Sequence, residues 1–565
     1  MKYLKNRGCI LFSIVISIFL AFQISGFALA RNPRLDWNRS FILILVLGSV
    51  IPGMILGVSI AWLLKHFQKK DENTKLTKYK NRFLQEDNRK TLNPAYKKMP
   101  PASLAWLIIL VSYIPAFLAY YPGICAYDCY IQVGQVVGGG WNDHHPILHT
   151  LVIKLFWMFG DIIGNVNIGI ALFVIFQLIC LSGSFAFCIH LIKNMGAGRG
   201  WYWILTGFGA LFPYNVFVGL SVTKAGLFAA SFLPVLVLLL YFIYEERYSL
   251  RLKKEDILYI FLLIPSTAFR NNARYPIMVL IVIFLIAAIE RMIAKKKVCY
   301  SYFRLFLTTL IGFIISMALV TTAFQILNAQ QGDRREMLSV PAQQFARTAA
   351  YNSEKIAPED METINNFILN EAWKLYDPVI SDPVKRHVNT WYVVHFPQKM
   401  AETYLRLLKE YPSEYIDSFL ANNAGYLYIG DKTCLTVYGN KPGLGFVQTN
   451  WADDMYDYGA SHESLIIWLY NFFEKMNSEN ILQRIPMLGI LLVPGYILWS
   501  YIYFALVCWY KKRYPLIISI VLAVLYLGTL LLGPTVQMRY IYPIWIFLPF
   551  LAAVVFREKS EETDS

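Results

Sequence analysis

The feature that most constrains this chain is the recurrence of apolar runs long enough to cross a membrane. A transmembrane helix needs about 20 mostly apolar residues, and such runs occur at 9–30, 41–64, 102–121, 168–192, 201–220, 225–244, 303–327, 486–509, 514–532 and 540–556. Two weaker runs, 256–269 and 276–293, form either two further crossings or one re-entrant hairpin. Because 56% of the residues are apolar and only 16% are charged, we predict an all-α polytopic membrane protein with about twelve transmembrane helices.

Lysine and arginine are distributed unevenly between alternate loops. One set of segments, which includes 65–101 and 291–304, carries between 2 and 11 of them each, whereas the alternate short loops carry between 1 and 3. Positive charge is retained on the cytoplasmic side of a membrane. We therefore predict a multi-pass plasma-membrane protein with the first set of loops and both termini in the cytoplasm. The first run also resembles a signal peptide, whose cleavage would leave eleven spans, but we favour a retained helix.

This orientation places one long segment, 328–485, outside the membrane. It holds 14 basic and 20 acidic residues, so the overall charge of +15 comes from the rest of the chain and reflects membrane orientation. No nucleic-acid partner is expected. Prolines interrupt stretches with helical spacing, which predicts a mostly helical extracytoplasmic domain. The expected parts are an N-terminal transmembrane module, 1–327, this domain, 328–485, and C-terminal transmembrane helices with a short cytoplasmic tail, 486–565.

Polar residues gather in the first outer loop, 122–167, and above all in CAYDCYIQVGQVVGGGWNDHHP. Asp128, Gln132 and Gln135 have the spacing of one helical face. Gly138, Gly139 and Gly140 must end that helix. Polar groups near a bilayer are costly and often functional, so this loop is the first candidate site.

A second helix is predicted to begin at Pro146, since proline suits the first turn of a helix. Its sequence, ILHTLVIKLFWMFG, sets His149, Thr150 and Lys154 opposite bulky apolar residues. We expect an interfacial helix that lies along the membrane.

The other unusual polar clusters all fall on the predicted outer side. Lys224, Arg270 and Arg539 each stand at the outer end of a span, and they are candidates to hold a phosphate. Weaker cationic candidates in the large outer segment are Arg347, Lys385 and Arg386. The further candidates for substrate binding are Gln132, Asp143, Thr223, Asn271, Asn272 and Tyr540.

The order of these motifs adds a family resemblance. YPGICAYD, HHP, SVTK, FRNN, REMLSVPAQQFAR, SDPVK and GPTVQMRYIYP follow one another as in an uncharacterised bacterial integral-membrane family. That family is similar in plan to the GT-C superfamily, whose multi-spanning glycosyltransferases use polyprenyl-phosphate sugars. The resemblance runs from about residue 120 to residue 543, and single motifs are short. Where relatives often have an acid after the lysine of SVTK, this chain has Ala225.

The resemblance implies a catalytic role for the acid of the first outer loop, Asp128. As a general base it would deprotonate an acceptor hydroxyl that attacks the anomeric carbon of the sugar. His144 and His145 are candidates for a catalytic or metal-binding role beside it. The implied partners are a polyprenyl-phosphate-linked sugar, a cell-surface glycan or lipid acceptor, and membrane lipids. A divalent cation, Mg or Mn, could assist the departing phosphate, although no ligand set for a metal can be assigned.

Each assignment has a structural alternative. Asp128 could be a charge at a helix N-terminus, and the three cations could reach lipid phosphates. A zinc site built from Cys125, Cys129 and the histidines matches no standard spacing.

Three functions stay open at this point. The first is a glycosyltransferase that acts on the outer face of the membrane. The second is a flippase or transporter of lipid-linked saccharides, and the third is another surface-modifying enzyme such as a polysaccharide polymerase or a phosphoethanolamine-type transferase. The spans are nearly free of acids, which disfavours the transporter, and the outer segment has few histidines, which disfavours the metal-dependent transferase. The polymerase would use the same donor on the same face.

Overall fold

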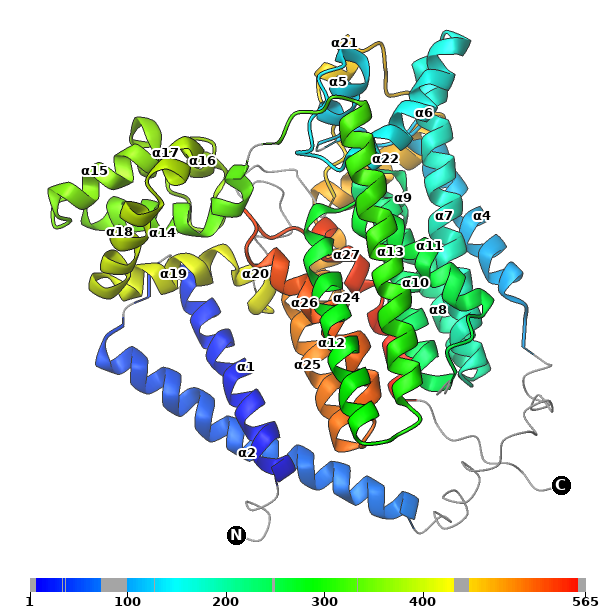
Figure 1. The fold of residues 1–565 in the computed structure, drawn as a ribbon, viewed down its shortest axis with the longest axis horizontal. Helices are drawn as coiled ribbons and strands as arrows, with labels where there is room; N and C mark the ends of the chain where they lie inside the picture. The colour runs from blue at the N-terminus through cyan, green and yellow to red at the C-terminus, as the bar shows by residue number, and fades with distance from the viewer. Residues whose placement is uncertain are drawn as a thin grey trace. The chain divides into compact units, whose positions relative to one another are not determined.

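The computed structural model describes residues 7–32, 34–35, 37–72, 99–126, 128–245, 249–332, 334–430 and 447–556. By its internal contacts the chain forms two compact units (Figure 1). Unit 1 comprises 1–99 with 340–431, and unit 2 comprises 100–339 with 432–565. The outer segment 328–485 is thus shared between the units, and the three-part division by membrane side stays a prediction. Both chain ends and most of the lysine-rich segment 65–101, predicted to be cytoplasmic, lie outside the described residues.

The predicted all-α polytopic class is confirmed. β-Pairing among the described residues is limited to isolated bridges. Eight helical segments in this part of the chain are long and apolar enough to cross a membrane, or nine if one bent pair counts as a span. The eight are Gly8–Arg31, Arg39–Trp62, Ala102–Ala119, Val166–Asn194, Lys224–Glu245, Asn271–Ile293, Cys299–Ile326 and Met538–Val555.

The remaining predicted spans are bent or short. The run 201–220 forms α8 (Arg199–Leu211) and α9 (Pro213–Leu220), which meet at 51°. The break follows from Pro213, because the residue before a proline avoids the helical region, and Phe212 is extended. Helices α11 (Lys254–Ala268), α25 (Gly495–Tyr510) and α26 (Ile517–Leu530) have 15, 16 and 14 residues. Twelve spans therefore stay a prediction.

Helix α10 (Lys224–Glu245) forms the centre of unit 2. In its apolar window 94% of the residues are buried, which fits a helix that is apolar on every side. It packs against α7 (Val166–Asn194), α11 and α27 (Met538–Trp545). Helices α4 (Ala102–Ala119), α12 (Arg274–Ile293) and α13 (Cys299–Ile326) also belong to this unit. Lys224, the first residue of α10, is thereby fixed at one end of the helical body.

The first outer loop forms the two predicted helices at one end of unit 2. Helix α5 (Cys129–Gly138) ends where Gly139 adopts a φ of 72°, as glycine readily does. Helix α6 (Ile147–Ile163) starts one residue after Pro146. In Figure 1, α5 and α6 lie near α21 (Asp454–Asp457), at the upper end of unit 2. The orientation of α6 along a membrane stays a prediction.

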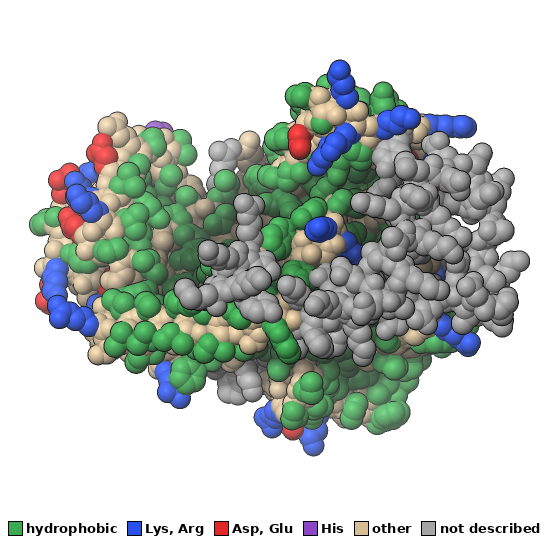
Figure 2. All heavy atoms as spheres, turned by 90° about the horizontal axis from the view of Figure 1, so that it is seen from below, with side chains coloured by type: hydrophobic (Ala, Val, Ile, Leu, Met, Phe, Trp, Pro, Cys, Tyr) green, Lys and Arg blue, Asp and Glu red, His purple; other side chains and the backbone are tan. Residues whose placement is uncertain are grey.

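Unit 1 pairs a helical hairpin with the helical domain predicted for the outer segment. Its hairpin consists of α1 (Arg7–Arg31) and α2 (Arg39–Glu72). A Cβ at Gly57 of α2 would lie 2.6 Å from Cα of Ser13 on α1, so the small residue permits a close crossing typical of membrane helices. Figure 2 shows hydrophobic side chains over much of the visible surface, as lipid contact requires. The domain helices are α14 (Ser339–Asn352), α15 (Pro358–Phe367), α16 (Asp382–Lys385), α17 (Thr390–His395), α18 (Pro397–Glu410), α19 (Pro412–Asn422) and α20 (Ala424–Leu427).

Candidate functional site

The chain before Asp128 is attached to the break between α9 and α10. Ile124 forms a parallel bridge with Ser221, and its amide and carbonyl make two 2.9 Å hydrogen bonds to the neighbouring backbone. The buried Gln177 of α7 donates from Nε2 to the carbonyls of Gly219 and Ser221, at 2.8 Å each. These bonds satisfy carbonyls that the end of α9 leaves without helical partners. Asp128 is consequently held close to Lys224.

The second half of the loop is attached to the segment that follows α13. Asn142 bridges Gln330, and the amide of Asp143 donates to the Gln330 carbonyl at 3.2 Å. The Asp143 carboxylate accepts a hydrogen bond from the amide of Gly332, while Asn271 donates to the Asp143 carbonyl at 3.2 Å. Asp143 and Asn271, both predicted to bind substrate, therefore hold the loop in place.

The charged centre of the site joins three distant parts of the chain. Asp128 occupies the N-cap position of α5 without a side-chain capping hydrogen bond, and its Oδ2 lies 3.5 Å from Lys224 Nζ and 3.5 Å from Arg539 Nη1. The side chains of Asp128, Lys224 and Arg539 are 31%, 19% and 10% exposed. His145 Nδ1 lies 3.1 Å from Lys224 Nζ. Asp128 is thus beside two of the cations predicted to share its site.

Arg270 is the third cation of this cluster. Its guanidinium carbon lies 5.0 Å from the centroid of the Tyr540 ring, and that of Arg539 lies at the same distance. The predicted residues Asn272 and Tyr540 also bind these cations, since Asn272 Oδ1 accepts from Arg270 Nε at 3.2 Å and the Tyr540 hydroxyl accepts from Arg539 Nη2 at 3.2 Å. Gln537, which belongs to a predicted outer polar cluster but was not among the candidate site residues, accepts from Arg539 Nε. We call Asp128, Lys224, Arg270 and Arg539 the ion cluster.

All three cations of the ion cluster stand at the N-terminal ends of helices. Lys224 is the first residue of α10, Arg270 directly precedes the short helix Asn271–Ala273 that leads into α12, and Arg539 is the second residue of α27. Helix N-termini carry partial positive charge. Cationic side chains and helix ends together create the potential that binds phosphates and carboxylates.

Two histidines of the loop are buried and neutral. Burial, reinforced by the charge of Lys224, lowers the pKa of His145 to about 2, and the same two causes lower the pKa of His149 to about 3. Gln132 Nε2 donates to His149 Nδ1 at 3.0 Å and to the Thr150 hydroxyl at 2.8 Å. Gln132, predicted to bind substrate, is therefore buried between α5 and α6.

The other predicted residues of this loop region differ in their accessibility. His144 is exposed, and its ring centroid lies 4.7 Å from that of His145. Thr223 is buried directly before Lys224. His144 is accordingly the histidine of the pair that a ligand can reach from solvent.

Opposing influences act on the pKa of Asp128. Burial raises it, but the positive charges of Arg539 and Lys224 outweigh burial, so the pKa lies well below its ordinary value. Asp128 is therefore ionised across the physiological pH range. A carboxylate held in this way attracts protons weakly.

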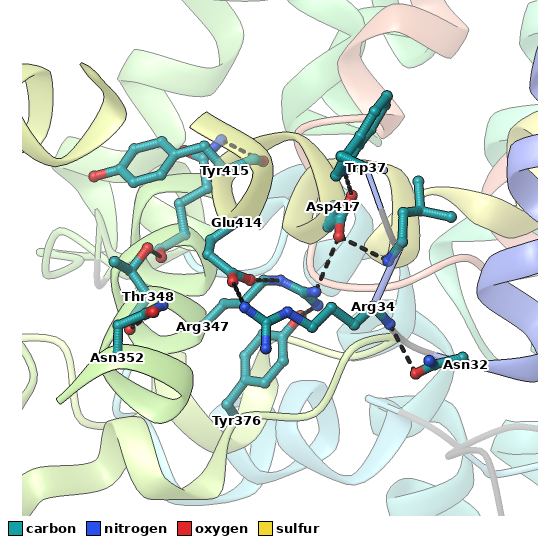
Figure 3. Close-up of polar contacts among 12 residues, drawn as sticks. Asn32, Arg34, Trp37, Arg347, Thr348, Asn352, Tyr376, Glu414, Tyr415 and Asp417 are labelled. Carbon is teal, nitrogen blue, oxygen red and sulfur yellow. Dashed lines mark hydrogen bonds and ion pairs between the residues drawn. The ribbon is translucent and has the colours of Figure 1, made fainter. Parts of the chain in front are cut away.

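Arg347 and Lys385 belong to unit 1, whereas the ion cluster belongs to unit 2. The buried Arg347 donates to Glu414 at 2.9 Å, to Asp417 at 3.2 Å and to the Tyr376 hydroxyl at 3.0 Å (Figure 3). Lys385 pairs with Asp382 at 2.7 Å. These contacts give both cations a structural use, and their predicted role beside Asp128 stays a prediction. Nothing in the spacing of the acids indicated that Glu414 and Asp417 would bind Arg347.

Metal ligands do not assemble within the described part of the chain. No three of its histidines, cysteines, aspartates and glutamates gather into a group that could hold a metal ion. Cys125 and Cys129 instead line an apolar pocket with Phe156, Trp157 and Phe173. Asp128 faces cations, so the ion cluster does not fit a protein-held Mg²⁺ or Mn²⁺.

Comparison with known proteins gives a family and no function. Searches of curated proteins and of solved structures found no match. Residues 138–565 match a family of unknown function, DUF6020. This range contains Lys224, Arg270 and Arg539 and begins ten residues after Asp128. Because it covers most of the sequence, the chain belongs to the DUF6020 family.

Proposed function

We propose that this protein is a GT-C-type glycosyltransferase of the bacterial plasma membrane. It moves a sugar from a polyprenyl-phosphate donor to a cell-surface glycan, polymer or lipid on the outer face. The proposal includes the predicted twelve spans and cytoplasmic termini. The observation that carries it is the ion cluster, in which Asp128 lies 3.5 Å from each of two cations at one end of a helical membrane body.

The ion cluster has the groups that such a transfer needs. Asp128 accepts the proton of the acceptor hydroxyl while the hydroxyl oxygen attacks the anomeric carbon of the sugar. The bond between that carbon and the phosphate oxygen breaks, and polyprenyl phosphate leaves with the bonding electrons. Lys224, Arg270 and Arg539 stabilise the charge that gathers on the leaving phosphate. No protein-held metal ion is required for these steps.

The distribution of charge in the spans favours transfer over transport. A transporter is expected to have ionisable groups near the membrane midplane. In the eight described spans, charged side chains lie within six residues of a helix end, and Arg304 is the deepest of them. A surface polysaccharide polymerase would share the donor and the face, so it remains the alternative enzyme.

The direct test supplies radiolabelled polyprenyl-phosphate sugars to membranes that contain the protein. We expect product with the parent chain and at least about a hundredfold less with Asp128→Asn, the scale of a lost general base. Asp161→Asn is the matched control, because it removes one exposed carboxylate from α6 and is expected to act like the parent. Equal transfer by Asp128→Asn and the parent would remove Asp128 from the mechanism. Movement of the lipid-linked sugar across vesicles without product would favour a flippase.

A further inference from the structure

Asp128, as Lys224 and Arg539 hold it in the ion cluster, is poorly suited to accept a proton. The carboxylate faces Lys224 and Arg539, and these charges favour its ionised form. A general base works best when its pKa lies near the operating pH. Asp128 can therefore act as the proposed base only after Lys224 and Arg539 have paired with another anion.

The composition of the ion cluster identifies that anion. Three cations accompany one carboxylate, and the neighbouring His145 adds no charge because it is neutral. The longer distances from Asp128, 3.5 Å to each cation, exceed those of a tight charge-assisted hydrogen bond, about 2.7–2.9 Å. A phosphate offers several oxygens to the same donors. It can therefore compete with a single carboxylate that is held loosely.

We infer that Asp128 is a built-in competitor for the lipid phosphate. In the structure it serves as the counter-ion of Lys224 and Arg539. An arriving phosphate takes over the contacts to Lys224 and Arg539, and the displaced carboxylate is then available to accept the hydroxyl proton. This inference rests on the proposed function for the transfer step, whereas the competition itself concerns binding alone.

The same competition supports product release. After transfer, Asp128 holds the proton from the acceptor, and polyprenyl phosphate holds the cations. When Asp128 returns to Lys224 and Arg539, its proton leaves to water and its carboxylate replaces the phosphate. One side chain thus couples the arrival of the donor, the proton transfer and the departure of the product.

The test is an equilibrium binding measurement on the full-length protein in lipid nanodiscs. The probes are polyprenyl phosphate, the uncharged polyprenol and phosphatidic acid. We expect Asp128→Asn to bind polyprenyl phosphate at least about tenfold more tightly than the parent, which is about 1.4 kcal/mol. Asp161→Asn removes the same charge outside the site and is expected to bind like the parent. Lys224→Met and Arg539→Met are expected to bind polyprenyl phosphate more weakly than the parent. A misfolded variant would also bind more weakly, so tighter binding by Asp128→Asn cannot result from misfolding.

Each outcome has a defined meaning. Unchanged or weaker binding by Asp128→Asn, or equal binding of polyprenol and polyprenyl phosphate by every variant, overturns the inference. Tighter binding of both polyprenyl phosphate and phosphatidic acid supports it and assigns recognition to the phosphate alone. If Asp128→Asn binds polyprenyl phosphate more tightly but the parent transfers no sugar, the competition is supported and the proposed function is overturned. Sugar transfer by the parent without tighter binding of polyprenyl phosphate by Asp128→Asn supports the proposed function and overturns the competition.

Discussion

Acid is expected to loosen the first outer loop, because this loop buries two neutral histidines. His145 and His149 have pKa values of about 2 and about 3 in the folded protein, against an ordinary value of 6.5. The free energy of opening the loop is highest above pH 6.5. It falls at lower pH, because the opened loop binds protons that the folded loop excludes. Between about pH 7.5 and about pH 5.5 the loss is about 1.4 kcal/mol for each histidine.

Hydrogen exchange of the amides in 141–150 measures this loss as the free energy of local opening. We expect a decrease of about 2–3 kcal/mol between the two pH values for the parent. His149→Gln should remove about half of the decrease, whatever its effect on the starting stability. His395→Gln is the control, since His395 is exposed in unit 1 and should leave the decrease unchanged. An opening free energy that does not change with pH, or an unaltered decrease in His149→Gln, would show that the folded loop does not hold these histidines neutral.

Two further predictions concern unit 1. Arg347→Met leaves Glu414 and Asp417 without their buried guanidinium and should lower the free energy of unfolding of unit 1 by about 3–5 kcal/mol. Lys409→Met, which changes an exposed cation of α18, should lower it by less than about 0.5 kcal/mol, and equal effects in denaturant titrations would disprove the structural role of Arg347. Gly57→Leu places a side chain against Ser13 and should cost about 1–3 kcal/mol. Gly207→Leu on α8 meets open space, so comparable thermal shifts for both variants would argue against the close crossing of α1 and α2.

The sequence predicted the helical class and the meeting of the ion cluster for different reasons. Apolar length alone identifies membrane helices, so the class follows directly. The positive-inside pattern assigned Asp128, Lys224 and Arg539 to one face of the membrane, which predicted that they share a site. Membrane sidedness brings distant residues to one surface but cannot show which of them touch. The bridge between Ile124 and Ser221 brings Asp128 close to Lys224, and no local sequence motif predicts this bridge.

Other features escaped prediction because they depend on tertiary partners. Arg347 resembles the cations of the ion cluster in sequence, yet its surroundings in unit 1 contain two buried carboxylates. Gln132 lies on the same predicted helical face as Asp128, but its amide is used by His149 and Thr150. The hydrogen bond from Arg539 to Gln537 could have been suspected from the sequence QMR, since the residues lie two positions apart. A polar side chain in a loop therefore indicates a candidate, and its neighbours decide its use.

Above all, we propose that the ion cluster faces the outside of the cell and holds a lipid phosphate. The most direct measurement labels the exposed position 144 in His144→Cys with a membrane-impermeant maleimide on intact cells, with the parent protein as background. We predict labelling without permeabilisation, and slower labelling in the presence of polyprenyl phosphate but not of polyprenol. Labelling that appears only after permeabilisation, or that polyprenyl phosphate does not slow, would contradict the claim.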